Sequence, residues 1–161
     1  MTTHGDLLRQ AMRRWTTGVC VVTCRAGDQQ HGMTVNSFTS VSLEPPMVTV
    51  TLAHKTRTYH LVSQSGVFGV TILNQRQREI ADIFSGKVPE QAGRFEKVET
   101  FVLSTGAPFL SGGLAFLDCL VRHIFPMTSS TLFVGEVIAV QYADLGEPLV
   151  YHNRLYQRLA P

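Results

Sequence analysis

Apolar and polar residues follow the pattern of short β-strands through most of this chain. Strands are predicted at about 18–25, 31–42, 47–53, 67–73, 114–125 and 131–142, with a final short pair at 148–151 and 155–159 that closes the sheet. Turn-forming residues separate them, for example Gly27 and Asp28 after the first strand. Many antiparallel strands with few helices predict a closed or nearly closed barrel rather than a parallel, doubly wound sheet.

Three helices are predicted beside these strands. The first follows Asp6 as N-cap, is expected to end at residues 16–18, and should pack on some other surface through apolar residues at helical spacing: Leu7, Leu8, Ala11, Met12 and Trp15. A second, short helix is predicted at 56–63. The third opens with a capping box of Asn74 and Gln77 and ends at Ser85 and Gly86.

A stretch rich in hydroxyl groups, residues 32–42, is the first candidate site. If it is extended, one face carries alternate side chains: Thr34, Asn36, Phe38, Ser40 and Ser42. Such an uncharged, hydrogen-bonding face suits a polar, flat or phosphorylated ligand. The alternative is an ordinary half-exposed antiparallel strand, in which Ser and Thr are common.

The second candidate site is the predicted strand-to-helix junction at residues 54–58. Unpaired backbone N–H groups and the positive end of the helix dipole meet there, beside the cations Lys55 and Arg57 and the hydroxyls of Thr56 and Thr58. This combination predicts a phosphate-binding site. The alternative is a solvated turn in which Thr56 is a simple N-cap.

Composition narrows the class of protein. A length of 161 residues with 44% hydrophobic content fits one globular domain, residues 1–161. The net charge of +2, with dispersed basic residues, argues against nucleic acid as a partner. Neither a signal peptide nor a membrane-spanning stretch is recognisable, so we expect a cytoplasmic protein with no membrane contact.

Cysteines and histidines give no sign of a metal site. Cys20, Cys24 and Cys119 have no zinc or redox spacing and are expected to be buried small hydrophobic residues. A link or shared ligand between Cys20 and Cys24, which would lie on one face of a strand, is the alternative. The chain also has no G-x-G-x-x-G element of a Rossmann unit.

Several segments, taken in order, resemble one family. The segment GMTVNSFTSVSLEPPMVTV (residues 32–50) is similar to the signature of the flavin reductase-like family, and further similarity lies in GAPFL (106–110), LAFLDC (114–119), TLFVGEV (131–137) and PLVY (148–151). The resemblance extends from about Met12 to Leu159. It implies a mainly β protein with peripheral helices: a six-stranded antiparallel split β-barrel, the FMN-binding split barrel, with the flavin at a homodimer interface.

The resemblance also implies an activity. Members are NAD(P)H:flavin oxidoreductases that bind FMN or FAD, take hydride from NADH or NADPH, and often supply reduced flavin to a monooxygenase partner. Hydride transfer between two cofactors needs no general base, so no catalytic side chain is predicted. The alternatives are an electron-transfer or pyridoxamine-phosphate-oxidase-like flavoprotein of the same fold, and a non-catalytic flavin-binding module.

Site residues follow from the same resemblance. It implies flavin contacts from Thr34, Val35, Asn36, Ser37, Ser40, Thr51, Leu52, Ala53, Lys55, Arg57, Thr58, Phe84, Ser85, Arg94 and Phe95. Among these, the backbone of 51–53 faces the flavin ring, and Arg94 can pair a phosphate bidentately, unless it is an ordinary surface arginine.

The nicotinamide contacts depart from the family pattern. Many relatives carry a His just before the TLFVGEV strand, where this chain has Ser130. Ser130 can hydrogen-bond a carboxamide but can neither stack nor titrate near neutral pH. His152 and Tyr156 are therefore further candidates for the nicotinamide site.

Overall fold

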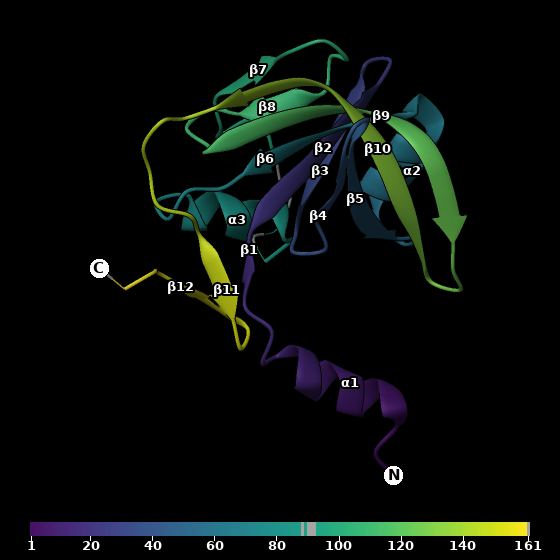
Figure 1. Cartoon of the computed structure of the whole chain (residues 1–161), viewed down its shortest axis with the longest axis vertical. Helices are drawn as coiled ribbons and strands as arrows, with labels where there is room; N and C mark the ends of the chain where they lie inside the picture. Colours follow the sequence, from purple (N-terminus) through teal and green to yellow (C-terminus); the bar gives the residue numbers. More distant parts are fainter. Residues whose placement is uncertain (88, 90–92, 161) are drawn as a thin grey trace.

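A seven-stranded antiparallel sheet forms the body of the protein (Figure 1). The structure is a computed structural model that describes residues 1–87, 89 and 93–160. The strands run in the order β3 (Gln29–Val35), β2 (Cys20–Ala26), β6 (Val67–Ile72), β9 (Ala115–Pro126), β10 (Ser130–Tyr142), β5 (Pro46–Ala53) and β4 (Thr39–Leu43). The mainly β architecture is confirmed, and the short edge strand β4 brings the main sheet to seven strands.

Two small sheets and three helices surround this body. β1 (Thr17–Gly18), β11 (Val150–His152) and β12 (Leu155–Gln157) form one small sheet, and β7 (Thr100–Val102) pairs with β8 (Pro108–Leu110). The helices are α1 (His4–Met12), α2 (Arg57–Ser65) and α3 (Arg78–Phe84). None of the helices within the described residues is long and apolar enough to cross a membrane.

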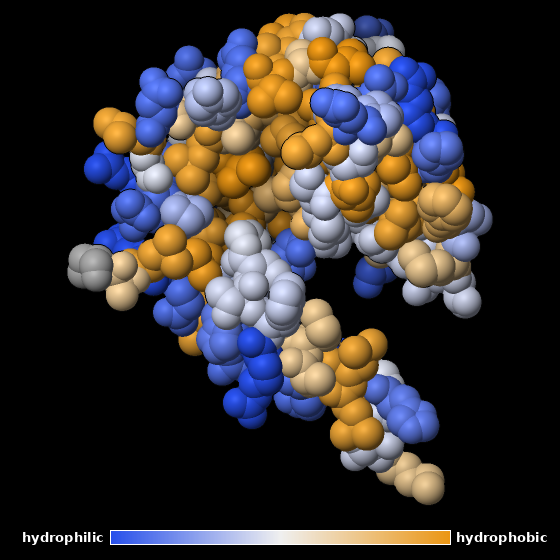
Figure 2. All heavy atoms as spheres, in the orientation of Figure 1, coloured by the Kyte–Doolittle hydropathy of each residue, from blue (hydrophilic) through white to orange (hydrophobic). Residues whose placement is uncertain are grey.

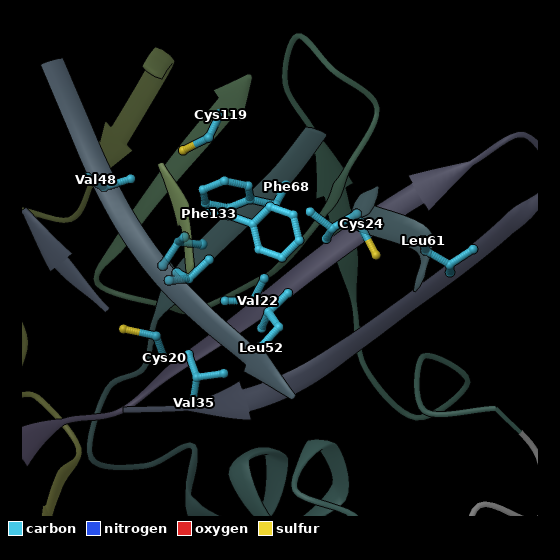
Figure 3. Close-up of a cluster of buried hydrophobic side chains, with 13 residues drawn as sticks. Cys20, Val22, Cys24, Val35, Val48, Leu52, Leu61, Phe68, Cys119 and Phe133 are labelled. Atoms are coloured by element: carbon cyan, nitrogen blue, oxygen red, sulfur yellow. The ribbon is translucent and has the colours of Figure 1, made fainter. Parts of the chain in front are cut away.

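The core fills the inside of the curved sheet (Figure 3). Val48, Val50 and Leu52 are buried at every second position of β5, because alternate side chains of a strand point to opposite faces. The rings of Phe68 and Phe133 lie at the centre. A Cβ on Gly135 would come within 2.5 Å of the Phe68 ring, so only glycine fits β10 at that point.

All three cysteines are free and buried, as predicted. Burial raises the pKa of Cys20 and of Cys24 to about 12, and raises that of Cys119 as well. These thiols are therefore packing residues rather than nucleophiles at neutral pH.

The predicted strand 31–42 is wrong as a single element. The chain leaves the sheet after Val35 and returns at Thr39, because the hydroxyl of Ser37 bonds to another strand. Ser37 Oγ donates to the carbonyl of Thr51 (3.0 Å) and accepts from its N–H (3.2 Å). Thr34 and Ser40 therefore do not share one strand face, and Ser40 lies on the exposed edge strand β4.

The first helix also differs from its prediction. Its N-cap is Thr3 rather than Asp6, which instead completes a capping box as the third helical residue. The helix ends at Met12, buries no residue and projects from the body (Figures 1 and 2). Within this chain its apolar residues stay uncovered: Leu8 and Trp15 keep 62% and 65% of their surface exposed.

The two other corrections concern the last helix and the last strands. α3 begins at Arg78, and of the predicted box only the bond from Asn74 N–H to Gln77 Oε1 (3.0 Å) forms. Instead of closing the main sheet, β11 pairs with β12 on one side and with β1 on the other, in a sheet of their own. This pairing joins the chain just after α1 to the C-terminal hairpin.

Candidate functional site

A cleft of about 380 Å³ lies where β3, the β5–α2 junction and the end of α3 meet. Residues predicted for the flavin site from four separate segments line it together: Thr34, Lys55, Arg57, Thr58, Phe84, Ser85 and Arg94. His31, Met33 and Thr56 complete its described lining. Of the side chains on the predicted face of the first candidate site only Thr34 lines this cleft, whereas Lys55, Thr56, Arg57 and Thr58 of the second candidate site all line it.

The β5–α2 junction supplies the positive side of this cleft. Thr56 caps α2: its Oγ1 accepts from Tyr59 N–H (3.3 Å) and donates to the carbonyl of Ala53 (2.7 Å). The N-cap interpretation of Thr56 is therefore confirmed. Lys55 and Arg57, on either side of it, are exposed at the cleft beside the positive end of the helix. An anion placed there meets two cations and a helix N-terminus.

Beneath the junction, a buried hydrogen bond joins β3 to α2. His31 Nδ1 and Thr58 Oγ1 are 2.9 Å apart, and Thr58 is fully buried. Thr58 therefore acts from below the surface, by fixing the start of α2 against the strand. Sequence reasoning missed His31, because a single histidine in a strand carries no local signal of a partner 27 residues away.

Arg94 joins two elements of the cleft. Its Nη1 donates to the carbonyls of Gly32 (2.8 Å) and Phe84 (2.9 Å), so this nitrogen ties the segment after α3 to β3. Phe95 packs edge-to-face against the buried ring of Phe84, with centroids 5.1 Å apart. Bidentate phosphate pairing by Arg94 stays a prediction, since Nη1 already has these two acceptors.

A second hollow of about 170 Å³ adjoins the cleft, and Thr34 and Ser85 line both. Val35, Asn36 and Tyr156 also line it. Lys87 Nζ lies 4.9 Å from the centre of the Tyr156 ring. Burial raises the pKa of Tyr156 to about 12, and the nearby Asp82 carboxylate adds to the shift. Tyr156 therefore keeps its hydroxyl proton at neutral pH.

The remaining predicted residues are spread around these hollows. Thr51 is bonded to Ser37 through its backbone, and the side chain of Leu52 is buried in the core, so Leu52 has only its backbone to offer a ligand. Ser130 stands opposite Ala53 in the β10–β5 pairing, at the end of β5 that leads into the junction.

His152 lies apart from Ser130, on the small sheet. Its Nδ1 is 2.8 Å from Thr16 Oγ1, a contact that ties β11 to the segment after α1. Neither Ser130 nor His152 is among the described residues that line the two hollows. The structure therefore does not gather the three predicted nicotinamide residues at one point.

Comparison with known proteins agrees with this fold. The family described as "Flavin reductase like domain" matches residues 12–160. The chain belongs to the flavin reductase-like family, and the predicted resemblance is confirmed. This family and the antiparallel barrel define a split-barrel flavoprotein of the reductase type.

Particular relatives are similar along nearly the whole chain. An NADH-dependent flavin reductase of Rhodococcus sp. is 37% identical over 94% of this chain and 85% of its own. The reductase component of the FADH(2)-dependent resorcinol hydroxylase of Rhizobium sp. (strain MTP-10005) is also 37% identical, over 98% and 88%. The solved NADH:FAD oxidoreductase SgcE6 of Streptomyces globisporus C-1027, in complex with NAD and FAD fragments, is 30% identical, covers 100% and 97%, and has a TM-score of 0.91.

Proposed function

We propose that the protein is an NAD(P)H:flavin oxidoreductase that binds FMN or FAD and reduces it with a nicotinamide nucleotide. The observation that carries this proposal is the cleft, where Lys55, Arg57 and the start of α2 meet the neutral hydroxyl side chains of Thr34 and Ser85. A flavin has a matching division, with a phosphate at one end and a flat, uncharged polar ring at the other. The described residues thus fit this group.

In this proposal the chain holds and orients its ligands. Lys55 and Arg57 bind the phosphate, and backbone groups of residues 51–53 lie along the ring. Ser37 helps to position this backbone through its two hydrogen bonds to Thr51. A bound flavin supplies the acceptor for hydride from the nicotinamide. Ser130 is the proposed hydrogen-bonding group for the nicotinamide.

The donor and the partners are part of the same proposal. We assign NADH as donor, which the relative named an NADH-dependent flavin reductase supports, and a monooxygenase as recipient of reduced flavin, which the resorcinol hydroxylase component supports. We assign a homodimer because α1 exposes an apolar side that its own chain leaves uncovered. Light scattering should then give twice the chain mass.

Steady-state turnover tests the proposed activity. Purified protein should oxidise NADH continuously when free FMN or FAD is in excess, with NADPH as the matched comparison. Oxidation that stops after one equivalent of bound flavin would contradict the proposal and favour an electron-transfer flavoprotein. Saturable flavin binding without any NADH oxidation would instead leave a flavin-binding module.

A further inference from the structure

A pocket of about 270 Å³ lies between the end of α1 and the turn that joins β11 to β12. Three arginines line it, Arg9, Arg13 and Arg154, together with the aromatic residues Trp15 and Tyr151. None of the described lining residues is acidic. Arg9 also forms a 2.8 Å ion pair with Asp6, which does not itself line the pocket. The pocket therefore presents positive charge together with flat apolar surfaces.

Several contacts hold this pocket in shape. The N–H of Asn153 donates to the carbonyl of Arg13 (3.1 Å), which joins the β11–β12 turn to the end of α1. Pairing of Thr17 with Tyr151 and the contact between Thr16 and His152 join the same two segments again. A preformed pocket loses less conformational entropy on binding than one that must close around its ligand.

Two of the arginines carry an energetic cost in the folded protein, one through an unpaired nitrogen and one through its backbone conformation. Arg13 Nε is buried and has no hydrogen-bond partner among the described residues. Arg154 has φ of +65°, in the second position of a two-residue turn where glycine is favoured. An anionic ligand would supply a partner for this nitrogen, and planar guanidinium groups suit phosphate oxygens in particular.

The pocket is continuous with the proposed flavin site. It shares Asn36 and Tyr151 with the second hollow, which in turn shares Thr34 and Ser85 with the cleft. A ligand that extends from the cleft along this line would therefore end among the arginines. Its far end should carry negative charge and an aromatic ring that can stack on Trp15 or Tyr151.

We infer that this arginine pocket binds the adenosine monophosphate moiety of a dinucleotide whose other half lies in the neighbouring hollows. The inference rests on the proposed function, and two ligands of that function contain this moiety: FAD and NADH. FMN lacks it. The three arginines thus discriminate between ligands that end at a single phosphate and those that continue into a second phosphate and adenosine.

The test replaces Arg13 and Arg154 together with glutamine and uses Arg14→Gln as the matched control. Arg14 is exposed and lines none of the described hollows. Dissociation constants of FMN and FAD are measured by flavin fluorescence, the KM of NADH by turnover, and binding of ADP-ribose by calorimetry. Melting curves exclude unfolding of the double variant, and ADP-ribose binding to the unaltered protein gives a readout that needs no variant.

If the moiety in the pocket belongs to FAD, the double variant binds FAD about tenfold more weakly, while its affinity for FMN stays within about twofold of that of the unaltered protein. If the moiety in the pocket belongs to NADH, the KM of NADH rises about tenfold in the double variant and ADP-ribose binds more weakly by the same factor. FMN and FAD then bind as they do to the unaltered protein. Unchanged FAD, NADH and ADP-ribose constants would overturn the inference, as would an equal loss of FMN affinity. Absence of any NADH turnover would contradict the proposed function, whereas the comparison of FAD with FMN and the ADP-ribose titration would still decide this inference.

Discussion

His31 Nδ1 and Thr58 Oγ1 lie 2.9 Å apart inside the protein and join β3 to the first turn of α2. The two walls of the cleft are thereby fixed relative to each other, since Thr34 follows His31 on β3 and Lys55 and Arg57 precede Thr58. The Sγ of Cys24 lies 3.7 Å from the carbonyl of Thr58 and packs the same point. The geometry of the proposed flavin site thus depends on a contact below its surface.

The first prediction concerns this contact. Thr58→Val keeps the side-chain shape but removes the hydroxyl, and should lower the free energy of unfolding by about 1–3 kcal/mol because a buried hydrogen bond is lost. Urea unfolding followed by circular dichroism measures the change. Thr58→Ser is the control, since it keeps the hydroxyl and should lose less. A valine variant as stable as the parent would show that the bond contributes nothing.

The second prediction concerns Lys55. Lys55→Ala should weaken flavin binding by about 1–3 kcal/mol, the range for a hydrogen bond to a charged group, and leave the rate at saturating flavin unchanged. Fluorescence titration and steady-state kinetics give the two quantities. Lys97→Ala, an exposed lysine outside the described hollows, should change neither. Equal flavin affinity in the Lys55 and Lys97 variants would refute the phosphate role of Lys55.

The third prediction concerns Ser130, where many relatives carry a histidine. Ser130→Ala should raise the KM of NADH about three- to tenfold, because one hydrogen bond to the carboxamide is lost, with little change in flavin affinity. Ser130→His should lower that KM. Ser129→Ala serves as control, because the contact of Ser129 with His54 uses its backbone carbonyl. NADH kinetics that do not change in either Ser130 variant would place the nicotinamide elsewhere.

A combined variant tests whether these two sites are separate. Lys55 and Ser130 are assigned to different ligands, so the effects of Lys55→Ala and Ser130→Ala should add in the double variant within about 0.5 kcal/mol. Both the flavin dissociation constant and the KM of NADH are measured. A double variant that differs strongly from the sum would show that both residues contact one ligand.

The last prediction is a loss of stability in alkali. The pKa of Cys20 and of Cys24 is raised from 9.0 to about 12 by burial, so the folded state holds these protons more tightly than the unfolded state. Their contribution is complete below about pH 9 and is lost as the pH rises toward about 12. Each thiol should remove about 1 kcal/mol by about pH 10. Urea unfolding at neutral and alkaline pH measures this, and Cys20→Ala should reduce the dependence on pH.

Local sequence patterns determined much of this protein. The apolar run that follows the double proline predicted β5, and the structure buries Val48, Val50 and Leu52 with the period of a strand. The N-cap role of Thr56, the alternative interpretation of the junction, was also recognisable, because capping depends on residues only a few positions apart. The position of the cationic junction therefore follows from the sequence alone, and the family signature in residues 32–50 adds the class of ligand.

Tertiary structure decided how these pieces meet. The break after Val35 follows from bonds between Ser37 and Thr51, and Arg94 reaches Gly32 across 62 residues. The arginine pocket exists only because the β11–β12 turn bonds to the end of α1 through Asn153 and Arg13. Hydrogen-bonding side chains have many possible partners along a chain, and only the folded barrel brings one of them within reach. For that reason the sequence determined the elements and the chemistry, whereas the long-range contacts determined the shape of the site.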